Sequence, residues 1–211
     1  EAGADGLADV RFEFPITVDA PRVVQVHTDG DVVTISSTTT PDDADQRWVR
    51  HVVARLARQP LPAAEPVATD VGGYDPSALA ELHNAWGIEG LAYPWTVESH
   101  DARPGELRMV VAFADAPQAP VASALDAAVN LGRLVDASSP GLMVPSAAGG
   151  VVFHGGPSQS HGVVVVRSRG HDADDLVVDI AVTTDDGTPW IDIHALRYTP
   201  VELGEVAAVD A

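Results

Sequence analysis

The sequence contains no cysteine and no lysine. The absence of cysteine excludes disulfide bonds and thiolate chemistry. Arginine supplies all 12 basic side chains against 31 acidic ones, so the formal net charge is −19. A chain this acidic is not expected to bind nucleic acid or an anionic membrane surface.

Long apolar runs are also missing, since none reaches the roughly 18 residues that a membrane-spanning helix needs. The opening EAGADGLADV has neither a basic region nor an apolar signal core, which predicts a start inside a folded region and a cytoplasmic location. Aromatic residues make up only 5% of the chain, yet 45% of its 211 residues are hydrophobic. That is enough to bury a core in one domain or in two small ones.

The N-terminal part has patterns typical of β-strands. The segment VRFEFPITV alternates until it meets Pro15, and VVQVHTDGDVVTISSTTT places two β-rich runs around Asp29-Gly30, which predicts a hairpin. The segment RWVRHVVARLA resumes the alternation. Prolines and glycines then gather in residues 60–73, which predicts a linker after an N-terminal unit at 1–59.

The C-terminal unit is predicted to span residues 74–203. It opens with YDPSALAELHNAWG, where Pro76 suits the first turn of a helix and Gly87 suits its end. Two strand candidates follow, LAYPWTVES and ELRMVVAFA, and then a helix over residues 122–135. Four further strand-like runs form a long antiparallel meander, and the last two surround Asp186-Gly187.

The predicted central helix, ASALDAAVNLGRLV, is apolar over most of its circumference, so we expect it to be largely buried. Ser123, Asp126, Asn130 and Arg133 fall on one narrow polar stripe of this helix. Helix chemistry alone favours a capping box, with Ser123 as the N-cap and Asp126 at N3, which leaves Asn130 and Arg133 solvated. The alternative is that Asp126 is an acid facing a substrate.

The order of the segments resembles the dehydratase domain of modular type I polyketide synthases over nearly the whole chain. The first strands and the Trp48-x-x-His51 ending look like the second part of that family's N-terminal hotdog. SALDAAVNLGRLV resembles the family's His-Pro-x-x-x-Asp-x-x-x-Gln/His helix. LMVPSAAGGVVFH is similar to its Leu-Pro-Phe segment, and LVVDIAVTTDDGTPWIDIHALRYTPVE to its last hairpin.

The resemblance implies an α+β double hotdog, in which a curved antiparallel sheet wraps each helix, with an incomplete N-terminal hotdog. It implies a lyase that removes water from a β-hydroxyacyl thioester by a His–Asp pair. Asp126 matches the family's aspartate, and Asn130 occupies the place of the Gln or His that orients it. No cofactor is implied, because the substrate is carried on the phosphopantetheine of an acyl carrier protein. The implied partners are this carrier protein and neighbouring synthase domains, and the resemblance allows a homodimer.

Several features depart from the family's pattern. None of the eight histidines fits the family's His-x-x-x-Gly-x-x-x-x-Pro motif, and Val121-Ala122 replaces His-Pro before Asp126. Two explanations remain open. The sequence is a fragment of a dehydratase whose catalytic histidine lies elsewhere, or it is a degenerate domain that folds but does not catalyse dehydration. The departures predict impaired catalysis. The alternatives to a dehydratase are a structural or dimerising domain and a related oxa-cyclase.

The remaining polar residues are expected to be structural. His51 lies on an alternating strand and is predicted to be a core or edge residue. His154 and His161 flank GGPSQS, which lacks the Lys and the following helix of a phosphate loop, and no third metal ligand is evident. The acidic turn after His171 is expected to be a solvated loop.

Overall fold

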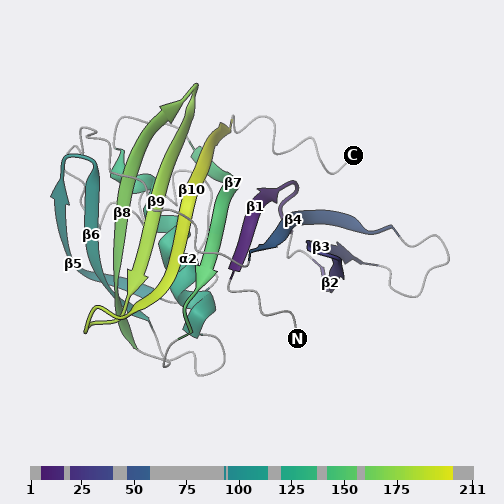
Figure 1. Cartoon of the computed structure of the whole chain (residues 1–211), viewed down its shortest axis with the longest axis horizontal. Helices are drawn as coiled ribbons and strands as arrows, with labels where there is room; N and C mark the ends of the chain where they lie inside the picture. Colours follow the sequence, from purple (N-terminus) through teal and green to yellow (C-terminus); the bar gives the residue numbers. More distant parts are fainter. Residues whose placement is uncertain are drawn as a thin grey trace.

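The computed structural model describes residues 6–16, 20–39, 47–57, 93, 95–113, 120–136, 142–155 and 160–201. Ten antiparallel strands form one sheet in the order β2-β3-β4-β1-β7-β10-β9-β8-β6-β5 (Figure 1). The strands are β1 (Gly6–Phe12), β2 (Val23–Asp29), β3 (Val32–Thr38), β4 (Val49–Ala57), β5 (Trp95–Arg103), β6 (Glu106–Phe113), β7 (Leu142–Phe153), β8 (His161–Asp172), β9 (Asp175–Thr183) and β10 (Pro189–Val201).

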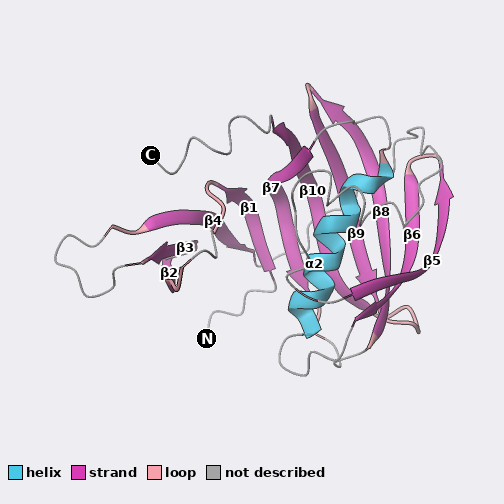
Figure 2. Ribbon diagram, turned by 180° about the vertical axis from the view of Figure 1, so that it is seen from behind, coloured by secondary structure: helices cyan, strands magenta, loops and turns pink. Residues whose placement is uncertain are grey.

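The described part of the chain has one α-helix, α2 (Pro120–Gly132), followed by a 3-10 turn at Arg133–Val135. This helix lies across one face of the half of the sheet formed by β5 to β10 (Figure 2). A helix held by an antiparallel sheet is the arrangement that the sequence predicts for its C-terminal unit. The helix predicted at Pro76 to Gly87 falls outside the described residues.

The predicted hairpins form where the sequence places glycine. Gly30 adopts a φ of 60° between β2 and β3, and Gly187 a φ of 84° between β9 and β10. Glycine enters this left-handed region without steric cost, which lets the strands turn back sharply. The strand predictions are confirmed, because all four N-terminal runs and all six C-terminal runs pair in antiparallel register. The predicted four-strand meander is wrong in its first member, because β7 pairs with β10 and not with β8.

Strand β1 joins the two halves of the sheet, because it pairs with β4 on one side and with β7 on the other. Gly6 of β1 is paired with Val152 of β7, and a Cβ on Gly6 would lie 3.0 Å from the Val152 Cα. Glycine therefore permits the close approach. The predicted linker at 60–73 falls in the undescribed part of the chain, so the predicted domain boundaries stay predictions.

The core lies between α2 and the inner face of the C-terminal half. Ala124, Ala127, Ala128 and Leu131 of α2 are fully buried. Alternate residues of the sheet pack on this side and are also 0–2% exposed: Leu107, Met109, Val111, Val164, Val166, Leu176, Val178, Ile180, Val182 and Ile193. This two-residue period is the pattern of strands with one face turned toward a helix.

Gly132 sets how closely α2 approaches the sheet. A Cβ at this position would lie 2.6 Å from Ile180 Cδ1 and would also collide with the Tyr198 hydroxyl. Tyr198 is 1% exposed, and its hydroxyl donates a hydrogen bond to the Val129 carbonyl at 2.6 Å. Burial raises the pKa of this phenol above its usual value, so the hydroxyl stays a donor.

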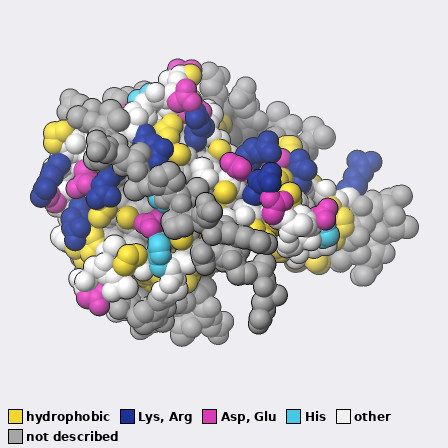
Figure 3. All heavy atoms as spheres, viewed as in Figure 1, with side chains coloured by type: hydrophobic (Ala, Val, Ile, Leu, Met, Phe, Trp, Pro, Cys, Tyr) yellow, Lys and Arg dark blue, Asp and Glu magenta, His cyan; other side chains and the backbone are white. Residues whose placement is uncertain are grey.

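The face of the sheet opposite α2 carries ion pairs beside buried valines, among them Val163 and Val165, which are each 6% exposed. Arginine side chains lie beside Asp and Glu on the face shown in Figure 3. Arg167 Nε pairs with Glu106 Oε2 at 2.9 Å, and Arg169 Nε pairs with Asp179 Oδ2 at 2.8 Å. These pairs connect neighbouring strands across the surface rather than filling a core.

Candidate active site

The helix that carries Asp126 begins earlier than predicted. It starts at Pro120, so its first turn contains no acidic residue and Asp126 lies in the second turn. The capping box of Ser123 and Asp126 is therefore wrong. The signal for the true start was Pro120 itself, because proline is favoured in the first turn, where its missing N–H costs no hydrogen bond.

The polar stripe of α2 is also less solvated than the capping hypothesis predicts. Ser123 is fully buried, its Oγ has no hydrogen-bond partner in the part of the chain that the structure describes, and Arg133 is only 8% exposed. Asp126 and Asn130 are half-buried. The stripe thus faces the protein over most of its length, and the prediction of a solvated Arg133 is wrong.

The carboxyl of Asp126 is held by an indole. Trp95, the first residue of β5, donates a hydrogen bond from Nε1 to Asp126 Oδ2 at 2.8 Å. Burial is the largest influence on this carboxyl and raises the pKa of Asp126, while the bond from Trp95 acts in the opposite direction. Asp126 therefore keeps its proton to a higher pH than an exposed aspartate, as a proton donor requires.

Asn130 lies one turn after Asp126 on the same helix. Its Nδ2 donates a hydrogen bond to the backbone carbonyl of Asp126 at 2.9 Å. This donor is consequently engaged by the main chain, and the bond does not orient the carboxylate. A catalytic role for Asn130 stays a prediction.

Sequence reasoning missed Trp95. In the sequence the residue is only an aromatic position within the predicted strand LAYPWTVES, and it precedes Asp126 by 31 positions. Nothing in the sequence pairs the start of an edge strand with the second turn of a helix. The contact is created by the fold, which brings β5 and β6 around the side of α2.

His51 is a buried structural residue, as predicted, with 3% of its surface exposed. Its Nδ1 lies 2.9 Å from the Phe14 carbonyl, and its Nε2 lies 2.7 Å from Ser37 Oγ. The carbonyl can only accept, so Nδ1 carries a proton, and in the neutral ring Nε2 accepts from the serine hydroxyl. With both nitrogens engaged, His51 of β4 is linked to β3 and to the segment that follows β1.

The other predicted histidines contact carboxylates other than Asp126. His154 Nε2 pairs with Asp192 at 2.7 Å, and His161 Nε2 lies 3.4 Å from Glu98. His171 Nε2 contacts Asp136 at 2.6 Å. In the described ranges no hydrogen bond or ion pair joins a histidine to Asp126, and no group of three His, Asp or Glu side chains could hold a metal ion.

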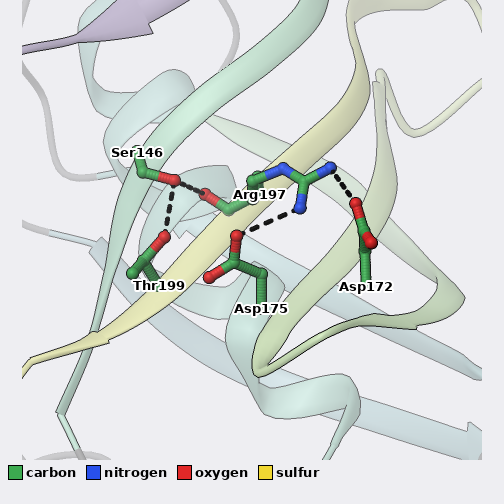
Figure 4. A network of polar contacts seen from close by, with 5 residues as sticks. All are labelled: Ser146, Asp172, Asp175, Arg197 and Thr199. Carbon is green, nitrogen blue, oxygen red and sulfur yellow. Dashed lines mark hydrogen bonds and ion pairs between the residues drawn. The ribbon is translucent and has the colours of Figure 1, made fainter.

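A second polar cluster surrounds Arg197 on β10 (Figure 4). Its guanidinium donates to Asp172 at 2.7 Å and to Asp175 at 3.0 Å, and these bonds raise the pKa of the arginine. Ser146 Oγ lies 3.4 Å from the Arg197 carbonyl and 2.8 Å from Thr199 Oγ1. Every charged group here is paired, so the cluster fastens the β8–β9 turn to β10.

Comparison with known proteins places this geometry in a family. Residues 121–208 match a family model described as the polyketide synthase dehydratase N-terminal domain. A phenolphthiocerol/phthiocerol polyketide synthase chain of Mycobacterium tuberculosis is 32% identical over 220 residues, which cover 97% of this chain and 12% of that protein. This chain is a polyketide synthase dehydratase-type domain.

The 6-methylsalicylic acid synthase of Penicillium expansum is a second relative of this dehydratase-type domain, 28% identical over 46% of the chain and 6% of that protein. The domain therefore spans only a small fraction of the length of the curated relatives it matches. No helix within the described ranges is long and apolar enough to cross a membrane.

Solved structures confirm the fold. The dehydratase domain from the CurJ module of curacin polyketide synthase has a TM-score of 0.73 at 13% identity, covering 95% of this chain and 76% of that one. The CurF dehydratase domain has a TM-score of 0.72 at 15% identity, covering 96% and 77%. The predicted hotdog architecture is confirmed, and the large antiparallel sheet of the dehydratase-type domain suits an N-terminal hotdog that is incomplete.

Proposed function

We propose that this domain acts on β-hydroxyacyl thioesters and that Asp126 supplies the proton for loss of water. The observation that carries the proposal is the half-buried carboxyl of Asp126, whose pKa is raised by burial. It lies on a helix that packs against one face of the sheet. A carboxylic acid that stays protonated can donate to a leaving hydroxide, whereas a solvated aspartate is already ionised at neutral pH.

The proposed step balances as an elimination. A base removes a proton from Cα, the electrons of that C–H bond form the Cα–Cβ double bond, and the Cβ–O bond breaks. Asp126 protonates the departing hydroxide, which leaves as water, and the resulting carboxylate regains a proton before the next turnover. A histidine suits the base because its ordinary pKa lies near neutral.

The partners belong to the same proposal. A substrate carried on phosphopantetheine requires an acyl carrier protein, and a domain of this family works beside other synthase domains in one chain or assembly. We propose the cytoplasm as the location, and a homodimer as an assembly open to test. No cofactor is required by the elimination, because neither electrons nor groups are exchanged with a carrier in the step.

A direct assay tests the proposal in the parent synthase. A β-hydroxyacyl pantetheine thioester is supplied, and the enoyl product is followed by mass spectrometry. We expect turnover by the unaltered protein and a loss of at least ~100-fold in Asp126→Asn and Asp126→Ala. Asp172→Asn is the matched control and should retain full activity, because the Asp172 side chain is 68% exposed and pairs with Arg197.

The second candidate is a non-catalytic structural domain. It is favoured by the histidine contacts in the described ranges, because each hydrogen-bonded ring engages a residue other than Asp126. Absence of turnover by a folded, unaltered synthase, with no change of product in Asp126→Ala, would establish this alternative. The same assay with an enoyl substrate bearing a free hydroxyl distinguishes an oxa-cyclase, which would add that hydroxyl across the double bond.

A further inference from the structure

Trp95 is placed firmly enough to control the geometry of a neighbouring carboxyl. The residue is 6% exposed and faces Phe113 in the β5–β6 register. Phe113 is itself held by Trp190, whose ring meets it edge-on with centroids 5.8 Å apart and planes at 83°. Edge-to-face packing of this kind favours one orientation of the rings.

Gly162 completes this aromatic support. A Cβ at Gly162 would lie 3.0 Å from Phe113 Cε2, so the phenyl ring rests directly against the β8 backbone. Trp95, Phe113 and Trp190 form one aromatic group that continues the hydrophobic core up to Asp126. The indole of Trp95, which donates to the Asp126 carboxyl, is therefore held in place by the packing of these aromatic rings.

The chemistry of the indole favours one oxygen of the carboxyl as the carrier of the acidic proton. An indole N–H is a donor only, so Asp126 Oδ2 accepts from it. The carbonyl oxygen of a carboxylic acid is a better acceptor than its hydroxyl oxygen, so this bond favours the acid with its hydrogen on Oδ1. In the carboxylate the same bond is charge-assisted and stronger, so Trp95 stabilises the state that follows proton transfer more than the state that precedes it.

We propose that Trp95 is the positioning residue of the acid: its N–H occupies Oδ2 of Asp126, directs the transferable proton to Oδ1, and stabilises the carboxylate formed when that proton leaves. This inference rests on the proposed function of Asp126. No bond of the indole forms or breaks in the step, because the proton that moves belongs to the carboxyl.

A purely structural role predicts different behaviour. Trp95 could only tie the edge strand β5 to α2, in which case its loss lowers stability without changing the titration of Asp126. Trp190 offers a matched control, because it belongs to the same aromatic group, is 1% exposed, and has an indole N–H with no hydrogen-bond partner among the described residues. Replacing Trp190 by Phe removes an indole but keeps an aromatic ring against Phe113, and it leaves the hydrogen bond from Trp95 to Asp126 in place.

The first measurement needs no turnover. In protein labelled with ¹⁵N-tryptophan, the indole N–H signal of Trp95 is identified by its loss in Trp95→Phe and followed across the acidic and neutral pH range. We expect this signal to titrate in the unaltered protein and Trp190→Phe, and to stay constant in Asp126→Asn. A Trp95 signal that does not move, or that moves equally in Asp126→Asn, would overturn the proposal.

The second measurement uses the dehydration assay. Trp95→Phe should lower kcat roughly 10- to 100-fold with little change in KM, since one donor to a developing charge is lost. It should also move the basic limb of the kcat profile to higher pH, because Asp126 loses a bond that favours its ionised form. An unmoved limb would contradict the proposal, as would an equal loss of kcat in Trp190→Phe.

Folding is controlled separately. If Trp95→Phe does not fold, replacement of Trp95 by 3-benzothienylalanine keeps the shape of the ring and exchanges only the N–H for sulfur. Failure of the proposed function is distinguishable from failure of this inference. A titrating Trp95 signal without any turnover by the unaltered synthase rejects the dehydratase proposal, whereas turnover that depends on Asp126 with a constant Trp95 signal rejects the role of Trp95.

Discussion

The two halves of the sheet differ in what covers them. Strands β5 to β10 surround α2, and the central residues on their inner faces are almost fully buried. From β1 to β4 only Val10 and Ala54 belong to the buried hydrophobic cluster of the described residues. Of the exposed large hydrophobic side chains that the structure describes, most lie in this N-terminal half: Phe12, Phe14, Ile16, Val23, Val24, Val26, Trp48 and Val49.

The difference shows what a helix contributes to a sheet. Strand alternation alone assigns one face to the interior, but that face gains free energy only when a second layer covers it. The C-terminal half has that layer in α2. Among the described residues the N-terminal half has no helix, and it is tied to the rest through the pairing of β1 with β7.

The largest effect should come from shortening a hydrophobic side chain in the C-terminal half, compared with the same kind of change in the N-terminal half. Leu131→Ala, on the fully buried face of α2, should lower the free energy of unfolding by about 3 kcal/mol. Val26→Ala, at a position 64% exposed on β2, should change it by less than ~0.5 kcal/mol. Urea denaturation measures both. Equal losses would mean that Val26 is covered in solution and that the contrast between the halves is wrong.

Glycine substitutions sharpen the comparison. Gly132→Ala should cost about 2 kcal/mol, because the new methyl group must displace the Tyr198 hydroxyl and Ile180. Gly30→Ala, in the β2–β3 turn with φ of 60° and open space around it, should cost about 1 kcal/mol through backbone strain alone. Thermal unfolding compares the two.

The double variant Gly132→Ala/Tyr198→Phe provides the control. Since one of the clashing groups is the hydroxyl, the double variant should be more stable than the sum of the single effects predicts. Simple additivity would show that the helix moves away from the sheet instead of meeting Tyr198.

Buried hydrogen bonds should matter about equally in both halves. Ser37→Ala leaves His51 Nε2 without its partner, and Tyr198→Phe leaves the Val129 carbonyl without the phenol; each should cost about 1 kcal/mol. Denaturant midpoints at neutral pH measure the losses. A negligible cost for Ser37→Ala alone would indicate that water reaches His51 and that the N-terminal half is looser than its geometry suggests.

The smallest effect concerns two carboxyls with opposite pKa shifts. Burial raises the pKa of Asp126 in the folded state, so the unaltered protein loses stability as pH rises from the unfolded pKa through the folded one. Asp126→Asn should therefore stabilise the protein at neutral pH, with the gain vanishing at lower pH. Thermal unfolding over the acidic and neutral range gives the profile.

Glu13 in the N-terminal half is the control for this profile. Its hydrogen bond with Arg50 holds the pKa of Glu13 below its usual value, so its contribution is present above the unfolded pKa and is lost as pH falls through the folded one. Glu13→Gln should slightly lower the free energy of unfolding at neutral pH and should leave it unchanged at acidic pH. Parallel profiles for the two variants would contradict the assignment of a buried acid at position 126.

The architecture could be predicted because its signals are local. Alternating β-branched residues mark the strands, and Gly30 and Gly187 mark the hairpins where the structure has them. The helix was placed within a few residues, but its start was wrong because Ser123-x-x-Asp126 imitates a capping box three residues after Pro120. A local motif cannot reveal that the chain is already helical when it reaches it.

The sequence by itself determined the alternation of the strands, the apolar character of α2 and the presence of an acid on its polar stripe. Only the tertiary structure decided that this acid is half-buried and bonded to Trp95, because the pKa of a carboxyl depends on the solvent and donors around it, and these come from strands distant in the chain.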